Sequence, residues 1–263
     1  MIDFSWMRSI ATEAALEAGE TLLERFRTDF KISKKGRIDL VTEMDLKAEE
    51  VILSRLRSEF PHHQILSEEK GAYSNTSPCK WIVDPLDGTT NYAHGYRFFC
   101  VSIALEVEGE LVLGVVYDPV AKELFSAQRG QGATLNGSPI SVSDQGELVD
   151  SLLSTGFSYT DGEIGKNLQF FNRIIFHSRA VRRDGAAALD LCHVACGRFE
   201  GFWELSLNAW DVAAGWLIVK ESGGSVTNLS GLACTIYDQE ILASNGKIHP
   251  SLIDIFQNID SNS

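Results

Sequence analysis

Two short turns in the middle of the chain constrain the fold more than any other feature of the sequence. Glu108-Gly109-Glu110 and Asn136-Gly137 each lie between segments whose composition is typical of β-strands. Turns of this length join antiparallel neighbours, because a parallel pair needs a crossover of a dozen or more residues. We therefore predict an antiparallel sheet in this part of the chain. Its strands are expected at residues 65–67, 81–83, 98–107, 111–117 and 123–127.

Helical patterns come before this sheet and alternate with strands after it. Apolar residues at helical spacing predict helices at residues 4–28 and 43–60, the second of which ends before Pro61. After about residue 150 the expected strands are 152–155, 180–181, 201–203 and 241–243, and the expected helices are 166–176, 186–196, 211–221 and a closing helix. This order predicts a layered α+β fold with two lobes, residues 1–145 and residues 146–263, that share one interface.

Composition limits the partners and the compartment that the chain can have. A net charge of -13 over 263 residues opposes unassisted binding to nucleic acid or to an anionic membrane, so neither is expected as a partner. An anionic substrate requires metal ions or local basic groups that reverse the field. The N-terminus shows no signal-peptide pattern, and no segment is apolar for long enough to span a bilayer. Five cysteines without a CxxC pair fit a reducing cytoplasm.

The segment WIVDPLDGTT marks the candidate site, because a buried strand runs directly into two acids. Buried carboxylates need a cation beside them. Asp84, Asp87 and the backbone carbonyl of Leu86 offer only oxygen ligands, which a hard cation such as Mg²⁺ prefers. Gly88 allows close backbone approach, and Thr89 is expected to open a short helix whose free N–H groups suit a phosphate. The alternative is a strand-end turn whose aspartates only cap the backbone.

Three further acids lie where a folded chain can bring them to the same place. Glu68 follows the strand at 65–67, Asp45 opens the second helix, and Asp211 opens a helix rich in small residues that ends on Gly223-Gly224. Simpler explanations exist. Glu69, the neighbour of Glu68, is explained as a loop acid that water solvates, and Asp45 and Asp211 are acids at helix N-termini, where they stabilise the helix.

Taken together, Ser67-Glu68-Glu69, the stretch from Trp81 to Asn91 and the stretch from Trp210 to Gly215 resemble the inositol monophosphatase family. Members of this family are magnesium-dependent, lithium-sensitive phosphatases of sugar phosphates. The resemblance covers nearly the whole chain and is closest in pattern to the bacterial members. It implies an α-β-α-β-α sandwich, a homodimer and two to three Mg²⁺ ions per site.

The resemblance also implies a role for individual residues. Glu68, Asp84 and the Leu86 carbonyl would hold the first ion, and Asp84, Asp87 and Asp211 the second. A third ion would lie near Glu68 through waters, with Asp45 in its outer shell. Thr89 and Asp45, together with Glu68, would orient and deprotonate the attacking water. The substrate contacts would be Asp87, the N–H groups of Gly88 and Thr89, Gly185, Ala186, Ala187, Glu204 and Asp211, with Arg182 or its neighbour Arg183 at the substrate edge or in an ion pair.

The expected reaction is hydrolysis of a phosphate monoester by in-line attack of a metal-activated water, without a covalent intermediate. Inositol 1-phosphate is the favoured substrate. Ala186 stands where animal members commonly have a hydroxyl residue, so histidinol phosphate, fructose 1,6-bisphosphate and NADP stay open. A non-catalytic regulatory or scaffolding protein of this fold is the alternative, although the complete acid set favours the enzyme. The basic segment 31–37, with Lys34, is predicted to be a mobile loop that either is solvated or closes over the site.

Overall fold

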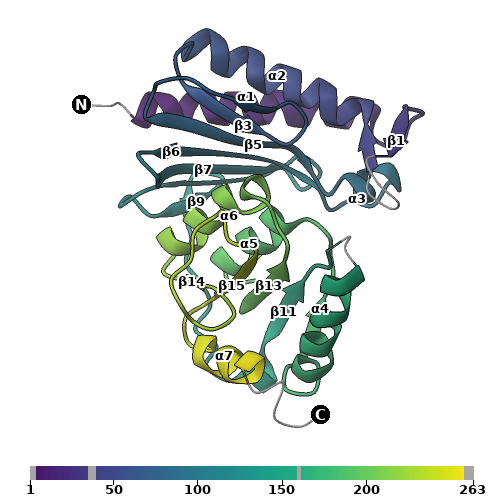
Figure 1. Cartoon of the computed structure of the whole chain (residues 1–263), viewed down its shortest axis with the longest axis vertical. Coiled ribbons are helices and arrows are strands. Elements are labelled where there is room, and N and C mark those ends of the chain that lie inside the picture. The colour runs from purple at the N-terminus through teal and green to yellow at the C-terminus, as the bar shows by residue number, and fades with distance from the viewer. Residues whose placement is uncertain (1–3, 35–39, 159–160, 258–263) are drawn as a thin grey trace.

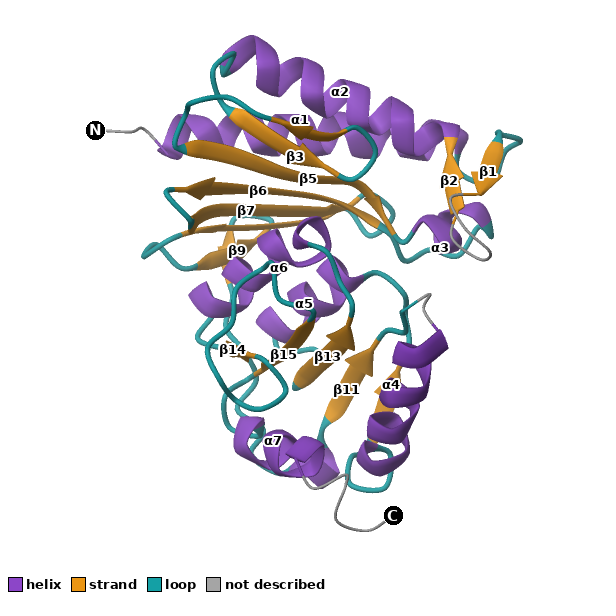
Figure 2. Cartoon of the chain, in the orientation of Figure 1, coloured by secondary structure: helices purple, strands orange, loops and turns teal. Residues whose placement is uncertain are grey.

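The computed structural model describes residues 4–34, 40–158 and 161–257. Its helices and sheets form five layers: two helices, an eight-stranded sheet, two helices, a five-stranded sheet and two helices (Figure 1). This arrangement confirms the layered α-β-α-β-α fold. Figure 2 shows the two sheets in orange, with helices on both faces of each. No helix within the described ranges is long and apolar enough to cross a membrane.

The first layer consists of α1 (Phe4–Arg25) and α2 (Glu43–Glu59). Small buried residues on α1, among them Ala11, Ala14 and Ala18, let the neighbouring layers approach closely. A Cβ at Gly19 would lie 2.6 Å from the ring of Tyr117 in the sheet below. Both helices were predicted, but α1 ends three residues early, where Arg27 adopts a φ of 62°.

The eight-stranded sheet has the order β10-β9-β8-β7-β6-β5-β3-β4, and every pair in it is antiparallel except β3 with β5. The turns at Glu108-Gly109 and Asn136-Gly137 have positive φ at both residues, which matches the twist of antiparallel strands. The strands are β3 (Gln64–Ser67), β4 (Gly71–Tyr73), β5 (Cys79–Asp87), β6 (Cys100–Val107), β7 (Glu110–Asp118), β8 (Glu123–Gln128), β9 (Ala133–Leu135) and β10 (Ser138–Pro139).

The middle layer, α5 (Ala187–Ala195) and α6 (Ala209–Glu221), lies between the two sheets and is built from small residues. A Cβ at Gly114 in β7 would lie 2.7 Å from the carbonyl oxygen of Ala214, and one at Gly215 would lie 2.6 Å from Leu191. One cluster of buried apolar residues runs from the first sheet through these helices into the second sheet. The lobe boundary near residue 145 stays a prediction.

The second sheet has the order β12-β11-β13-β15-β14 and is covered on its outer face by α4 (Asp161–Ile174) and α7 (His249–Gln257). β11 is parallel to both of its neighbours, whereas β15 is antiparallel to both of its own. The strands are β11 (Leu152–Thr155), β12 (Ala180–Arg182), β13 (Gly201–Leu205), β14 (Ser225–Thr227) and β15 (Glu240–Ser244), and the 3-10 turn η1 (Leu148–Asp150) leads into them.

The basic segment before α2 differs from the prediction. Ile32–Lys34 forms β1, which pairs antiparallel with β2 (Leu40–Thr42), so this part is an edge ribbon rather than a loop. Residues 35–37 of the predicted loop lie outside the described ranges. The sequence signal was missing because three-residue strands, here and at β4, β9 and β14, carry too few positions to show an alternating pattern.

Candidate functional site

A cavity of about 780 Å³ opens where the end of β5 faces the ends of β13 and α6. Residues from both halves of the chain border it. From the predicted set these are Glu68, Asp84, Leu86, Asp87, Gly88, Thr89, Gly185, Ala187, Glu204 and Asp211. The tertiary structure therefore gathers most of the predicted residues, separated by up to 143 positions in sequence (211 − 68), around one space.

A bulge at the end of β5 turns its two acids into this cavity. The pairing of β5 with β6 shifts register between Asp84 and Asp87, where Pro85 has no N–H to donate. The Leu86 side chain is buried in the core beneath α1 and α2, while Leu86 also borders the cavity and its carbonyl oxygen lies 3.0 Å from Thr89 Oγ1. The N–H of Leu86 donates to Asp84 Oδ1 at 3.0 Å, which fixes that carboxylate.

The loop after β3 is held in place from α2, so that Glu68 reaches the same cavity. The Ser67 hydroxyl and the Lys70 N–H both donate to Glu49 Oε1, at 2.6 and 2.9 Å, and Glu49 is fully buried. The N–H of Glu68 donates to the Val83 carbonyl at 3.2 Å. Sequence reasoning missed Glu49, because nothing near it in the sequence indicates that a helical acid supports a distant loop.

The carboxylates of the cavity repel one another. Asp84 and Asp87 are only 2% and 8% exposed. Burial, followed by the charges of Glu68, Asp87 and Asp211, raises the pKa of Asp84 well above its ordinary value. Burial also raises the pKa of Asp87 to about 7, although hydrogen bonds that include one from the Ala188 N–H at 2.7 Å oppose this shift. A divalent cation between these groups would relieve the repulsion and restore the charged forms.

The donor set fits a hard cation. Carboxylate and carbonyl oxygens are what Mg²⁺ takes, and among the described residues no His or Cys side chain borders the cavity. In the part of the chain that the structure describes, no three His, Cys, Asp or Glu side chains already stand together as a metal site. The number of ions, expected as two to three, therefore stays a prediction.

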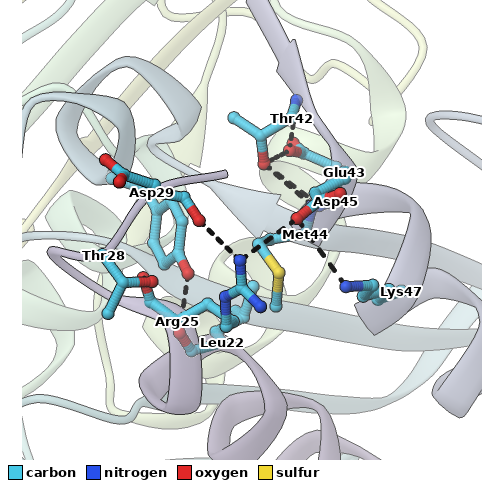
Figure 3. A network of polar contacts seen from close by, with 10 residues as sticks. Leu22, Arg25, Thr28, Asp29, Thr42, Glu43, Met44, Asp45 and Lys47 are labelled. Atoms are coloured by element: carbon cyan, nitrogen blue, oxygen red, sulfur yellow. Dashed lines mark hydrogen bonds and ion pairs between the residues drawn. The ribbon is translucent and has the colours of Figure 1, made fainter. Parts of the chain in front are cut away.

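Asp45 reaches the cavity through Thr89. It closes a capping box at the start of α2, where its Oδ2 accepts hydrogen bonds from the Thr42 N–H at 2.8 Å and the Thr42 hydroxyl at 2.6 Å (Figure 3). Its other oxygen, Oδ1, lies 2.9 Å from Thr89 Oγ1. Burial raises the pKa of Asp45, although the hydrogen bonds from Thr42 and Thr89 oppose this. Asp45 is thus a helix cap and a partner of Thr89 at the same time.

Gly88 and Asn91 join the first sheet to the α5 side of the cavity. Gly88 has a φ of +91°, and a Cβ there would lie 2.9 Å from the Phe98 carbonyl oxygen. It precedes the short helix α3 (Thr89–Ala93) that was expected at this point. The Asn91 amide donates to the carbonyls of Phe98 and Asp184, each at 2.7 Å. Asn91 is another supporting residue that local sequence reasoning missed.

The opposite wall comes from β13 and α6. Asp211 is the third residue of α6, and its Oδ2 accepts the Asn208 N–H at 2.7 Å, so it caps the helix as well as bordering the cavity. Glu204 lies in β13 and is 8% exposed. Burial, followed by the charge of Asp211, raises the pKa of Glu204 to about 8.

Two predicted substrate residues lie elsewhere. Arg182 is the exposed last residue of β12 and does not border the cavity, whereas the next residue, Arg183, does. β12 ends between the two arginines, so only Arg182 belongs to the strand and Arg183 lies in the segment that follows it. Ala186 is buried behind Gly88, with its Cβ 3.3 Å from where a Gly88 Cβ would be. The structure does not describe the Lys34 side chain.

Several cavity residues carry no local motif. Glu163 comes from the first turns of α4, Gln239 from the segment before β15, and Phe157 from the loop after β11. Each lies in an ordinary loop or helix start, so only the packing of the second sheet against the middle layer reveals it.

The layered fold and the carboxylate-lined cavity are those of a phosphoric monoester hydrolase. The sequence model of the inositol monophosphatase family matches residues 3–261, and the chain belongs to that family.

Individual relatives agree with this assignment. An inositol-1-monophosphatase of Synechocystis sp. is 45% identical over 251 residues, which cover 94% of this chain and 87% of the relative. The Nus factor SuhB of Pseudomonas aeruginosa is 41% identical over 259 residues, which cover 95% and 96%. The structure of an inositol monophosphatase from Anabaena matches with a TM-score of 0.88 at 43% identity, covering 98% of this chain and 97% of that one.

Proposed function

We propose that this chain hydrolyses the phosphate monoester of a small polyol or sugar in a Mg²⁺-dependent reaction, with inositol 1-phosphate as the favoured substrate. The main support is the pair of buried acids at the bulged end of β5, Asp84 and Asp87, because burial, followed by the charges of Glu68, Asp87 and Asp211, raises the pKa of Asp84. Such a group is unfavourable on its own and becomes favourable only with a divalent cation between its members. Relatives that bear the name inositol monophosphatase support the substrate.

The residues that would hold Mg²⁺ are Glu68, Asp84, the Leu86 carbonyl, Asp87 and Asp211, all of which border the cavity. When bound, Mg²⁺ would supply the positive charge that a phosphate dianion needs and that favours deprotonation of water. The protein supports two of these ligands by hydrogen bonds: the Leu86 N–H holds Asp84 at the bulge, and the Asn208 N–H holds Asp211 at the start of α6.

Thr89 and Asp45 are proposed to orient the attacking water and to accept its proton. Glu68, the third residue proposed for this step, borders the same cavity. The Thr89 hydroxyl lies 2.9 Å from Asp45 Oδ1 and 3.0 Å from the Leu86 carbonyl, and it borders the cavity. A water that donates to Thr89 Oγ1 can therefore pass a proton on as Thr89 donates to Asp45. The Gly88 and Thr89 N–H groups are proposed to bind the phosphoryl oxygens, in line with the position of Gly88 before α3.

The α5 and β13 side of the cavity is proposed to bind the polyol. Gly185, Ala187, Glu204 and Asp211 border the cavity opposite the β5 bulge. Glu204 supplies carboxylate oxygens for hydroxyl groups, and Arg183 is the basic residue of this wall, in place of the predicted Arg182.

A substrate panel tests the proposal. Phosphate release is measured from inositol 1-phosphate, histidinol phosphate, fructose 1,6-bisphosphate and NADP, with Mg²⁺ and with a chelator. We expect Mg²⁺-dependent turnover, highest kcat/KM for inositol 1-phosphate, and none with the chelator. Equal turnover with the chelator would reject the metal-dependent mechanism, and a higher kcat/KM for another ester would reassign the substrate.

A regulatory role is the second candidate, because one relative at 41% identity is named Nus factor SuhB. The two roles need different residues. A purely regulatory chain has no use for a repelling acid cluster, so a wild-type protein that releases phosphate from none of the panel esters would favour regulation.

We further propose that the chain is a cytoplasmic homodimer. Phe176, just after α4, is 85% exposed, and Ile175 and Leu168 are also exposed, which is unfavourable unless a second surface covers them. All five cysteines are free thiols, as a reducing compartment requires. Sedimentation at several protein concentrations would show a dimer, and a monomer at all of them would reject this assembly.

A further inference from the structure

Gly156, the residue after β11, leaves a space that the Glu204 carboxylate fills. A Cβ at position 156 would lie 2.1 Å from both carboxylate oxygens of Glu204 and 2.2 Å from its Cδ. These separations are far shorter than any contact between real atoms. The φ of Gly156 does not lie in the left-handed region, so the backbone there does not itself demand glycine. The missing side chain thus serves Glu204.

Asn167, a buried residue of α4, fixes the backbone on which Glu204 rests. Its side-chain amide donates to the carbonyl of Gly156 and, at 3.2 Å, to the hydroxyl of Thr155. Its Oδ1 accepts the indole N–H of Trp203 at 2.7 Å. The Thr155 hydroxyl in turn donates to the Trp203 carbonyl at 2.7 Å. Trp203 directly precedes Glu204, so this network holds both the surface under the carboxylate and the strand that carries it.

The network explains why the carboxylate must stay at this place. Asn167, Thr155 and Trp203 are buried, so the backbone at Gly156 has no room to retreat. Any side chain at position 156 therefore displaces the Glu204 carboxylate, which borders the cavity. A carboxylate that lies against Gly156 keeps that space open and presents its oxygens to a ligand.

We infer that Gly156 and Asn167 are positioning residues that hold Glu204 against the cavity wall and thereby set the preference for esters with hydroxyl groups beside the phosphate. This inference rests on the proposed function, because it concerns the polyol side of the same site. Asn167 does not border the cavity, and Gly156 borders it beside Glu204. Their effect is on substrate choice, through the hydrogen bonds that Glu204 offers to hydroxyl groups.

The first experiment compares G156A with G165A on two substrates. Gly165 lies in α4 and is exposed, and a Cβ added there would meet no atom within 4 Å, so G165A is a matched control. Inositol 1-phosphate carries hydroxyl groups, whereas p-nitrophenyl phosphate carries none. Leaving a buried donor or acceptor without its hydrogen-bond partner costs about 1–3 kcal/mol. We therefore expect G156A to lower the kcat/KM ratio of inositol 1-phosphate to the aryl ester by about 10- to 100-fold, mainly through KM.

The control defines what contradicts the inference. G165A should leave the ratio within about twofold of wild type, since surface changes usually alter interactions little. An unchanged ratio in G156A would overturn the inference, as would an equal loss on both substrates. Thermal unfolding of both variants identifies a general loss of structure.

A second measurement does not depend on turnover. Crystal structures of wild type and G156A show directly where Glu204 lies. We expect its carboxylate to turn away from residue 156 into the cavity, and an unmoved carboxylate would overturn the inference even if the wild type hydrolyses none of the esters. If the wild type is inactive but Glu204 is displaced in G156A, only the proposed function is rejected.

The N167D variant tests the network. It keeps the acceptor for Trp203 but replaces the donor to Gly156 with a carboxylate oxygen. We expect the ratio of the two kcat/KM values to fall as in G156A, and an unchanged ratio in a folded N167D protein would remove Asn167 from the inference.

Discussion

Single residues at the site do two tasks at once. Asp45 caps α2 through Oδ2, and its Oδ1 lies 2.9 Å from Thr89 Oγ1. Asp211 caps α6 through Oδ2 and also borders the cavity. Asp84 receives a hydrogen bond from its own bulge and borders the cavity. The simpler explanations at the sequence level were therefore true of Asp45 and Asp211, but they did not exclude a place in the site, because a carboxylate can accept several hydrogen bonds.

Asp84 provides a prediction at this scale. In D84N a buried carboxylate among other acids becomes a neutral amide, so kcat should fall more than about a hundredfold if this group holds Mg²⁺. In chelator the same variant should be more stable than wild type by about 1–3 kcal/mol, because a buried repelling charge is removed. Phosphate release and denaturant unfolding measure the two effects. Near-normal turnover, or lower stability in chelator, would contradict the assignment.

At the scale of elements, the ends of strands and helices place the chemistry. The bulge of β5, the capping box of α2 and the first turn of α6 each present an acid at a defined position. Element ends suit this purpose because their backbone groups are unsatisfied and their side chains are not part of a packed face.

The capping box of α2 yields the second prediction. T42A removes the hydroxyl that holds Asp45 and that accepts the Met44 and Asp45 N–H groups. Loss of such a cap costs about 0.5–2 kcal/mol of stability. We expect kcat to fall as well, because Asp45 loses part of its fixed orientation toward Thr89. T42S keeps the hydroxyl and serves as the control, and it should retain both stability and kcat. Denaturant unfolding curves measure the stability of the two variants, and steady-state kinetics measure their kcat.

His193 in α5 predicts a pH dependence of stability. Its ring packs at the edges of Phe98 and Phe199, and burial, followed by the charge of Arg198, lowers its pKa to about 4. The unfolded chain binds a proton at a pKa near 6.5, so the unfolded state is favoured as pH falls from about 6.5 towards 4. The contribution of His193 to stability is therefore complete above this range and lost within it.

The H193Q variant checks this dependence. Its unfolding free energy should fall less between pH 7 and pH 5 than that of the wild type, because glutamine does not titrate. Parallel slopes for the two proteins would show that other groups cause the loss.

The whole molecule depends on close contact between its layers. Because Gly114 and Gly215 have no side chains, β7 packs closely against α6, and α6 packs closely against α5. The cavity forms where these layers meet the ends of β5 and β13. Closeness of the layers therefore also determines how far the acids of the first sheet lie from Glu204 and Asp211.

Gly114 gives the prediction at this scale. In G114A the new Cβ would lie 2.7 Å from the backbone oxygen of Ala214, so the layers must separate. Overpacking of this kind costs about 1–3 kcal/mol, and kcat/KM should fall because the two walls of the cavity shift. Gly146 has no neighbouring atoms at its side-chain position, so G146A should leave stability and activity unchanged. Equal stability of G114A and wild type would contradict this account of the interface.

Local signals in the sequence were enough to predict most of the elements and a layered α+β fold, whereas the five layers and the roles of the acids were implied by the resemblance to the family. Hydrophobic periodicity, short turns and the Asp84-Pro85-Leu86-Asp87 motif each depend on residues that are near one another in the chain. Short strands such as β1 were not predicted, because three residues are too few to show an alternating hydrophobic pattern. The sequence left Arg182 and Arg183 as alternatives and favoured Arg182, but Arg183 borders the cavity, since the direction of a side chain depends on where the strand ends.

The distant residues that support the site became visible only in the folded chain. These residues act through contacts between segments that are far apart in sequence. Glu49 supports the loop that carries Glu68, Asn91 donates a hydrogen bond to the Asp184 carbonyl, and Gly156 leaves space for the Glu204 carboxylate. No local pattern encodes them, because the free energy of such contacts comes from packing that exists only after the layers have assembled.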